Sequence, residues 1–408
     1  MRLPLRGILP PGLPPQFYLL VGGSLLTSTG FTMAFPFLTL YLSTQLGVPM
    51  DRVGMLFIGN SAAGLIAQTM AGPIADRFGR KPVMVMGLLT QACVAVAYTQ
   101  ARAFEEFVLL AFLNGFFGAF FMPASSAMVI DLVGNERRTQ AFGITRVAAN
   151  LGWVIGPSLG GLLATQSYSL LFLGAAVAQL IYMVLLLIFA RETLPAGTRK
   201  AALQGWTGGY GVVLSDHKFM VFIAASVLTA LVYTQLNTTM PVYLKRDKGI
   251  MESGYGMLMA LNAGMVVLFQ FPTTRVVEHR DRVYMLALGS LLYALGLGSL
   301  GLGQTLLHFA VSVAVLTAGE IVIAPVASAL VAELSPDHMR ARYMAVFGLT
   351  WTLGFGLGPT WGGIVMQHWG SQWVWNLAFL FGCLSALAYL PLRRMMGRSQ
   401  RRPSLQDG

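Results

Sequence analysis

The chain has 408 residues, of which 55% are hydrophobic and only 11% charged, and its mean hydropathy is +0.66. A soluble protein carries about 25% charged residues, so the composition excludes a soluble enzyme or binding domain and predicts a polytopic membrane protein. The net charge of +11 does not indicate nucleic-acid binding, because the basic residues stand in short clusters between apolar runs.

Charges and turn residues divide the chain into twelve apolar runs, each long enough to cross a bilayer as a helix of about 20 residues. The runs are 16–43, 52–74, 82–101, 104–132, 139–165, 168–190, 219–244, 253–277, 283–304, 307–333, 341–367 and 371–392. The sequence therefore predicts an all-α membrane protein with 12 transmembrane helices.

The basic residues predict the orientation. The loops expected outside carry only Arg52, Arg102, Lys245, Arg246 and Lys248, and nearly all other lysines and arginines fall on the side of both termini. By the positive-inside rule both termini are cytoplasmic, and the expected location is the plasma (inner) membrane.

The longest stretch between apolar runs separates two sets of six helices. We expect a cytoplasmic lead at 1–15, a six-helix bundle at 16–190, and a linker with a short interfacial helix at 191–218. A second bundle at 219–392 and a basic tail at 393–408 complete the predicted domains.

The two halves are related by an internal repeat. Shifting the sequence by 202 residues places 123–161 on 325–363 without a gap, so that Pro123 meets Pro325 and Arg138 meets Arg340. Two parallel sets of six helices are typical of secondary transporters, whose site lies at the repeat interface near the bilayer midplane.

The turn between the second and third runs reads G-P-I-A-D-R-F-G-R-K, from Gly72 to Lys81. It resembles motif A of the major facilitator superfamily, whose charges latch the two halves in the outward-open state. The resemblance implies that Asp131 is the acidic partner of the motif A arginine. The implied gate consists of Gly72, Asp76, Arg77, Gly79, Arg80, Lys81 and Asp131.

The fifth run contains G-W-V-I-G-P-S-L-G-G, which resembles motif C of the antiporter branch of this superfamily. Its glycines flatten one helix face for close packing, and its proline removes a backbone donor. The residues are Gly152, Gly156, Pro157, Gly160 and Gly161. The segments Gly319–Pro325 and Arg191–Pro195 are similar to those of drug/proton antiporters, specifically LmrP-like multidrug exporters.

One family motif is incomplete. Motif B places an arginine on helix 4, three residues before a Gln-Gly pair, and this chain has Ala111 and Asn114-Gly115 there. Coupling through that arginine is therefore not expected.

Glu320 is the one acidic residue deep in a membrane run. A carboxylate there costs roughly 3 kcal/mol, which favours proton uptake near neutral pH, so we expect Glu320 to exchange a proton for substrate. The alternative is a permanently protonated or arginine-paired acid. Arg146 is the one basic residue inside a helix; its alternatives are a structural role near the cytoplasmic gate and a role in coupling.

The resemblance implies that helices 1, 4, 7 and 10 line the substrate cavity. The candidate residues on them are Ser28, Thr32, Asn114, Phe117, Tyr233, Asn237 and Glu320. Few charges with several aromatic and amide groups suit bulky amphipathic compounds. Packing in the core or against lipid is the alternative for the aromatic residues.

The chain has no phosphate-binding loop, metal-ligand cluster or nucleophile motif, so neither an enzyme nor a cofactor is expected. The predicted function is proton-coupled export of drug-like amphipathic compounds by alternating access, and the family expectation is a monomer. Two alternatives are an exporter of a specific metabolite (a sugar, amino acid, siderophore or lipid) and a non-transporting scaffold or sensor.

Overall fold

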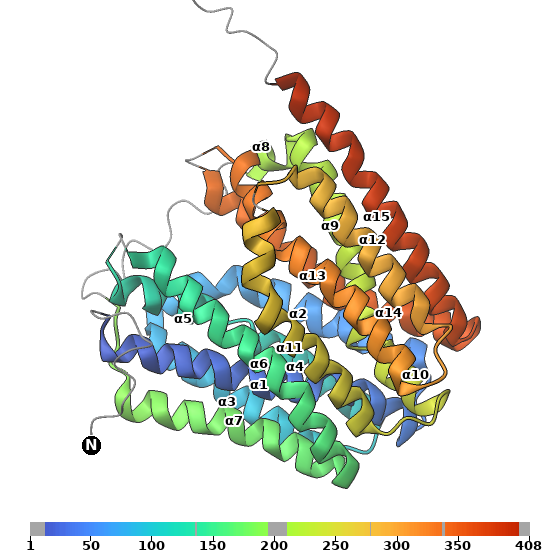
Figure 1. The fold of residues 1–408 in the computed structure, drawn as a ribbon. Coiled ribbons are helices and arrows are strands. Elements are labelled where there is room, and N and C mark those ends of the chain that lie inside the picture. Colours follow the sequence, from blue (N-terminus) through green and yellow to red (C-terminus); the bar gives the residue numbers. More distant parts are fainter. Residues whose placement is uncertain (1–12, 135–136, 195–209, 278, 337–338, 400–408) are drawn as a thin grey trace, which may run out of the picture. The chain divides into compact units, whose positions relative to one another are not determined.

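The computed structural model describes residues 13–134, 137–194, 210–277, 279–336 and 339–399, and within these ranges the regular secondary structure is entirely helical. Figure 1 shows the helices in chain order. The first-half helices are α1 (Pro15–Thr44), α2 (Met50–Phe78), α3 (Arg80–Tyr98), α4 (Phe104–Gly118), α5 (Phe121–Leu132), α6 (Arg138–Gln166) and α7 (Tyr168–Phe189).

The second half begins with the six-residue helix α8 (Tyr210–Ser215), which falls in the predicted linker. The helices that follow are α9 (His217–Tyr233), the 3₁₀ turn η3 (Thr234–Leu236), α10 (Thr239–Arg246), α11 (Glu252–Val277), α12 (Arg282–Leu300), α13 (Leu306–Leu334), α14 (Arg340–His368) and α15 (Ser371–Ser399). Residues 195–209 of the linker lie outside the described ranges.

Two predicted helices are interrupted. The fourth divides into α4 and α5 around Ala119 and Phe120, and the seventh divides into α9 and α10 at η3. The second break falls in the polar run from Thr234 to Thr239, whose side chains are buried. Irregular backbone at membrane depth is tolerated where it is buried in protein.

Eleven segments of the described chain are long and apolar enough to cross a membrane, with α4–α5 and α9–α10 each counted once. The 29-residue α14, which corresponds to the predicted run 341–367, is not among these eleven. The predicted all-α membrane fold is confirmed, with the helices grouped in two units.

The first unit contains residues 1–35 and 62–204, and the second contains 36–61 and 205–408. Residues 36–61 therefore group with the C-terminal helices, which the sequence did not predict. Thr360 Oγ1 of α14 donates to Gly54 O of α2 at 2.9 Å, and Met50 N donates to Gln367 Oε1 at 3.1 Å. The predicted domain bounds stay a prediction.

Each unit has its own packed core. In the first, α3 lies against α7, and the Tyr182 ring occupies the space that Gly23 leaves by lacking a side chain. In the second, α12 packs between α13 and α15.

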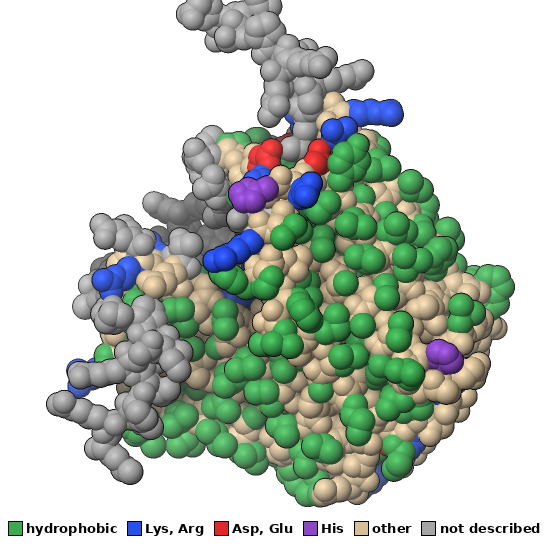
Figure 2. Space-filling view, viewed as in Figure 1, with side chains coloured by type: hydrophobic (Ala, Val, Ile, Leu, Met, Phe, Trp, Pro, Cys, Tyr) green, Lys and Arg blue, Asp and Glu red, His purple; other side chains and the backbone are tan. Residues whose placement is uncertain are grey.

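Apolar side chains also cover outer faces of the helices. On α7, Leu173, Val177, Ile181 and Val184 are exposed at helical spacing. Over α12, α13 and α15, Figure 2 shows mostly hydrophobic side chains, with the charged ones gathered near the α8 end. Such faces are stable in lipid and unfavourable in water, which makes this an integral membrane protein.

Candidate functional site

Glu320 lies near the middle of α13, and both of its carboxylate oxygens contact a donor. Asn262 Nδ2 of α11 donates to Oε2 at 2.9 Å, and Tyr233 OH of α9 donates to Oε1 at 3.4 Å. No Lys, Arg or His among the described residues forms an ion pair with it. Two neutral donors stabilise an ionised carboxylate without cancelling its charge, so a proton or a cation still binds favourably.

The sequence did not predict Asn262, which fixes the position of Glu320. The same Nδ2 donates to Thr317 Oγ1 at 2.9 Å, and that hydroxyl donates to Val313 O at 2.6 Å. Thr317 precedes Glu320 by three residues, so the two side chains share a face of α13. The available signal was one of only two amide side chains, Asn262 and Gln270, in the apolar run 253–277.

Aromatic rings surround Tyr233. Its ring centroid lies 5.7 Å from that of Tyr293 on α12 and 5.4 Å from that of Trp351 on α14, the latter in a T-shaped contact. Tyr233 and Tyr293 are buried, whereas Trp351 is 38% exposed. The second unit thus combines a carboxylate with an accessible indole.

Of the other predicted cavity residues, Asn237 lies in the same unit, at the end of η3. It is buried, and its Nδ2 has no hydrogen-bond partner among the described residues. Ser28, Thr32, Asn114 and Phe117 belong to the first unit. Thr32 is buried and donates to Gly152 O at 3.2 Å, and the other three are half-buried. A common cavity for the two groups stays a prediction.

Arg146 is exposed on α6, and no described residue forms a hydrogen bond or ion pair with it. Asp131 forms its ion pair with Arg80 and not with Arg146. The choice between a structural and a coupling role for Arg146 stays open to test.

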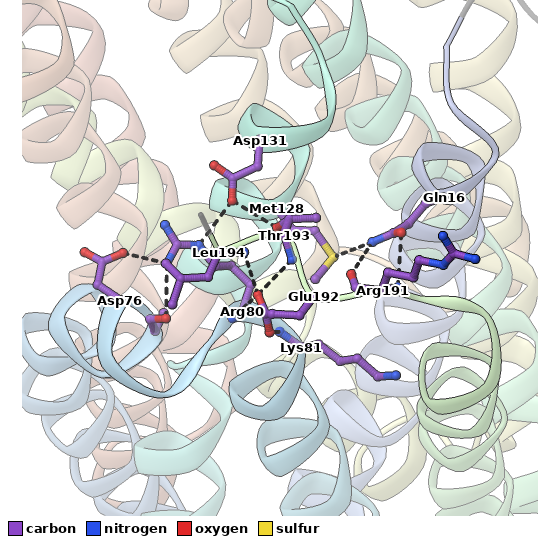
Figure 3. A network of polar contacts seen from close by, with 11 residues as sticks. Gln16, Asp76, Arg80, Lys81, Met128, Asp131, Arg191, Glu192, Thr193 and Leu194 are labelled. Atoms are coloured by element: carbon purple, nitrogen blue, oxygen red, sulfur yellow. Dashed lines mark hydrogen bonds and ion pairs between the residues drawn. The ribbon is translucent and has the colours of Figure 1, made fainter. Parts of the chain in front are cut away.

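The motif A residues form a connected network with the end of α7 (Figure 3). Arg80 is buried, with Nη1 at 2.8 Å from Asp76 Oδ1 and Nε at 3.2 Å from Asp131 Oδ2. Asp131 also accepts a hydrogen bond from Thr193 Oγ1 at 2.9 Å. Arg80 is therefore the arginine that Asp131 pairs with.

The remaining motif A residues are Gly72, Arg77 and Gly79, which form none of these ion pairs, and Lys81, which connects the network to the end of α7. Gly72 lies within α2, and Gly79 links α2 to α3 with φ at +105°, a conformation that favours glycine. The Arg77 guanidinium lies over the Phe78 ring at 5.3 Å from its centroid. Lys81 Nζ donates to Leu187 O and Ala190 O at the end of α7.

The repeat reproduces the central ion pair. Arg282 and Glu333 occupy the positions of Arg80 and Asp131 shifted by 202 residues, and they form an ion pair. Both side chains of this second pair are more than one third exposed, whereas the side chain of Arg80 is only 9% exposed.

The motif C glycines bring two helices together in each unit. A Cβ on Gly152 would lie 2.7 Å from Leu25 O, and one on Gly156 would lie 2.7 Å from Thr29 O, so α6 contacts the backbone of α1. Pro157 lies inside α6, and Gly160 and Gly161 are buried.

The copy of motif C on α14 contacts the broken seventh helix. Gly354 faces Ala230 and Gly358 faces Thr234, while Gln235 Nε2 donates to Gly358 O at 2.8 Å. Thr234 corresponds to Thr32 in the 202-residue repeat. In both halves, therefore, a threonine at equivalent positions (Thr32 and Thr234) contacts the equivalent motif C glycine (Gly156 and Gly358).

The comparison with known families agrees with this geometry. The model of the Major Facilitator Superfamily matches residues 20–251 and 240–404. The chain belongs to the Major Facilitator Superfamily. It is a non-enzymatic secondary transporter, as predicted.

Among superfamily members, the chain is 29% identical to a Na⁺, Li⁺, K⁺/H⁺ antiporter of Planococcus maritimus, over 90% of this chain and 93% of that protein. It is 28% identical to the multidrug resistance protein MdtH of Citrobacter koseri, over 85% of each chain.

Solved structures share the fold. A bacterial homologue of the human lysosomal transporter Spinster has a TM-score of 0.80 at 15% identity, covering 96% of this chain and all of that one. A mutant form of the nucleoside transporter NupG has a TM-score of 0.79 at 16% identity, covering 92% of this chain and 99% of that one.

Proposed function

We propose that the protein is a proton-coupled antiporter that exports drug-like amphipathic compounds, including cations, by alternating access. Substrate and proton compete for Glu320. The observation that carries the proposal is a membrane-embedded carboxylate held by Asn262 and Tyr233 without a basic partner among the described residues.

The uncompensated charge of Glu320 supports exchange. An ionised carboxylate at this depth costs roughly 3 kcal/mol, and binding either a proton or a cationic substrate removes that cost. Because both ligands neutralise the same oxygens, binding of one releases the other.

The surrounding side chains support an amphipathic substrate. The accessible indole of Trp351 offers an aromatic face to an apolar or cationic group. The unpaired amide nitrogen of Asn237 can donate a hydrogen bond to a substrate oxygen. A relative named as a multidrug resistance protein matches 85% of this chain.

The motif A network and the motif C contacts are the proposed gate and packing elements of the transport cycle. We place both termini in the cytoplasm, because the lysines and arginines concentrate in the loops on their side of the plasma (inner) membrane. A monomer is proposed from the family resemblance alone.

A second candidate function is exchange of a monovalent metal cation for a proton. It is favoured by the Planococcus maritimus relative, which is named as a Na⁺, Li⁺, K⁺/H⁺ antiporter. In this case Glu320 Oε1 and Oε2 would bind the alkali cation directly. An exporter of a specific metabolite stays the third possibility.

The test is transport by proteoliposomes under an imposed pH gradient. Native protein, Glu320→Gln and the control Glu105→Gln are compared for movement of a cationic dye and, in parallel, for proton flux on addition of Na⁺, Li⁺ or K⁺. Glu105 is an exposed acid at the first turn of α4, distant in sequence from the site.

We expect gradient-driven dye movement in the native protein and in Glu105→Gln, and its loss in Glu320→Gln. Dye movement that survives Glu320→Gln contradicts the role of Glu320. Cation-dependent proton flux without dye movement selects the second candidate. The absence of both activities selects export of a specific metabolite.

A further inference from the structure

The carboxylate of Glu192 caps the N-terminus of α3. Oε1 accepts the backbone N–H of Arg80 and Oε2 accepts that of Lys81, both at 3.0 Å. Oε1 also accepts the N–H groups of Thr193 and Leu194 at 2.9 Å. The first N–H groups of a helix have no intrahelical acceptor, and α3 obtains its acceptor from a segment more than one hundred residues later in the chain.

Burial and hydrogen bonding act in opposite directions on this carboxyl group. Partial burial raises the pKa of Glu192, and the backbone N–H groups of Leu194, Arg80, Lys81 and Thr193 lower it by more, so the pKa lies below its ordinary value. Glu192 is therefore ionised at neutral pH, the form that accepts these bonds.

Lys81 completes a reciprocal arrangement. Its Nζ donates to Leu187 O at 2.9 Å and to Ala190 O at 2.8 Å, and so satisfies the carbonyl groups at the C-terminus of α7. An anion near the N-terminus of α3 and a cation near the C-terminus of α7 both interact favourably with the helix dipoles. Each helix end is thus fixed by the other.

The same segment holds both members of the central ion pair. Glu192 binds the backbone of Arg80, and its neighbour Thr193 binds the carboxylate of Asp131. On the other side, Arg191 N donates to Gln16 Oε1 at 3.1 Å and Arg191 O accepts from Gln16 Nε2 at 2.7 Å, which fixes the segment to α1. Residues 191–194 therefore join α1, α3, α5 and α7 (Figure 3).

The absence of a side chain at Gly79 leaves room for the Glu192 carboxylate. A Cβ at Gly79 would lie 2.5 Å from Glu192 Oε2, and the φ of +105° is unfavourable for any other residue. The second glycine of motif A thus admits Glu192 to the end of α3, in addition to allowing the turn.

In the second half of the chain, the N-terminus of the equivalent helix α12 is capped by a different kind of residue. Asp281 occupies the position of Gly79 in the repeat and caps its own helix, accepting from Val283 N and Tyr284 N. Arg393, which corresponds to Arg191, contacts the other oxygen of Asp281 at 2.9 Å. In the first unit, the acceptor for the start of α3 is Glu192, which follows α7. In the second unit, the acceptor for the start of α12 is Asp281, the residue that directly precedes that helix.

We propose that Glu192 is a positioning residue of the motif A gate. It holds the first turn of α3 so that buried Arg80 engages Asp76 and Asp131. The inference rests on the proposed role of motif A in transport, and it assigns to residues 191–194 a mechanical part in that role.

The test compares Glu192→Gln with Glu106→Gln in the full-length protein. Glu106 is a matched control, because its carboxylate also caps a helix, accepting from Arg102 N at 2.6 Å and Ala103 N at 3.1 Å at the start of α4. Glutamine keeps the shape of glutamate and replaces one acceptor oxygen by a donor group. Amide hydrogen exchange within residues 79–84, all of which except Pro82 have an amide proton, and proteoliposome transport are measured for both variants.

A third readout does not depend on substrate. Spin labels at exposed Gln140 of α6 and Met344 of α14, with Cys93 and Cys383 replaced by serine, report the distance between the ends of the two units. If the variant releases Arg80 from Asp76 and Asp131, the motif A gate no longer holds its state, and the populations of this distance distribution change.

For Glu192→Gln we expect faster exchange at 79–84, an altered distance distribution and a transport loss of about tenfold or more. Glu106→Gln should match the native protein in all three readouts. Unchanged exchange at 79–84, or faster exchange with a native distance distribution, overturns the inference. If native protein moves neither dye nor alkali cation, the proposed function fails while the exchange and distance measurements still decide the role of Glu192.

Discussion

Arg80 Nε lies 3.2 Å from Asp131 Oδ2, and the corresponding residues 202 positions later, Arg282 and Glu333, form an ion pair in the second unit. The two pairs differ in their surroundings. Arg80 is buried and also contacts Asp76, whereas Arg282 and Glu333 are both more than one third exposed. The exposed pair in the second unit therefore serves as an internal control for the buried ion pair of the motif A gate.

Replacing Arg80 by Met should destabilise the protein by about 3–5 kcal/mol, because breaking a buried ion pair leaves its partner's charge uncompensated. The equivalent Arg282→Met should cost under about 1 kcal/mol, since exposed ion pairs contribute little. Thermal unfolding in detergent measures both. Equal losses would show that burial does not distinguish the two pairs.

Removing the amide of Asn262 should change the pH dependence of transport. In Asn262→Ala, Glu320 loses the donor at 2.9 Å that favours its ionised form. Proton release then requires a higher pH, so the pH of half-maximal exchange should rise. Transport rates across the range from acid to alkaline pH measure the shift.

The control for Asn262 is Gln270→Ala on the same helix. Gln270 Nε2 donates to Ile321 O and Thr274 Oγ1 and makes no contact with Glu320 among those described. Its pH profile should keep the native midpoint. A shift of the same size in both variants would assign the effect to helix packing.

Gly79→Ala should lower the melting temperature more than Gly47→Ala does. Both glycines have positive φ, so both variants carry a backbone cost of about 1–3 kcal/mol. A side chain at Gly47 meets open space, and one at Gly79 meets the Glu192 carboxylate. The excess loss at Gly79 should shrink in a Glu192→Ala background, and an excess that stays constant would refute the contact.

Gly156→Ala should destabilise the first unit by about 1–3 kcal/mol, because the added methyl group meets Thr32 and the α1 backbone. Gly143→Ala, on the same helix with open space around it, should be neutral or slightly stabilising. Unfolding midpoints compare the two variants. Similar midpoints would contradict close α1–α6 packing.

The contribution of Glu192 should depend on pH only under acid conditions. Its folded-state pKa is lowered, so its stabilisation is fully present above the unfolded value of about 4.3 and is lost as the pH falls through the folded value. The difference in melting temperature between native protein and Glu192→Gln should therefore be constant near neutral pH and vanish in acid. A difference that already disappears at weakly acid pH, well above the unfolded value, would contradict the lowered pKa.

The helices, the repeat and an ion pair between Asp131 and a motif A arginine were predictable, because apolar runs, shared spacing and motif resemblance are properties of the sequence. That this arginine is Arg80 and not Arg77 required the structure. The helix packing behind motif C was indicated by its glycines, but their partners Leu25 and Thr29 are backbone contacts that no pattern identifies.

Two features of the sites depend on contacts that the sequence does not reveal. Glu192 binds backbone N–H groups, which nearly every residue possesses, so nothing in α3 marks it as a partner. Asn262 meets Glu320 only because α11 and α13 pack together. The break at η3 had a visible signal in its polar run, although burial of that run required the fold.

The central claim is that proton and substrate compete for Glu320, and substrate-induced proton release tests it most directly. A cationic dye is added to detergent-solubilised protein in weakly buffered solution near neutral pH, and the pH change is recorded for native protein and Glu320→Gln. We predict stoichiometric proton release by the native protein and none by the variant. Dye binding without proton release by the native protein, or equal release by both proteins, would contradict the account.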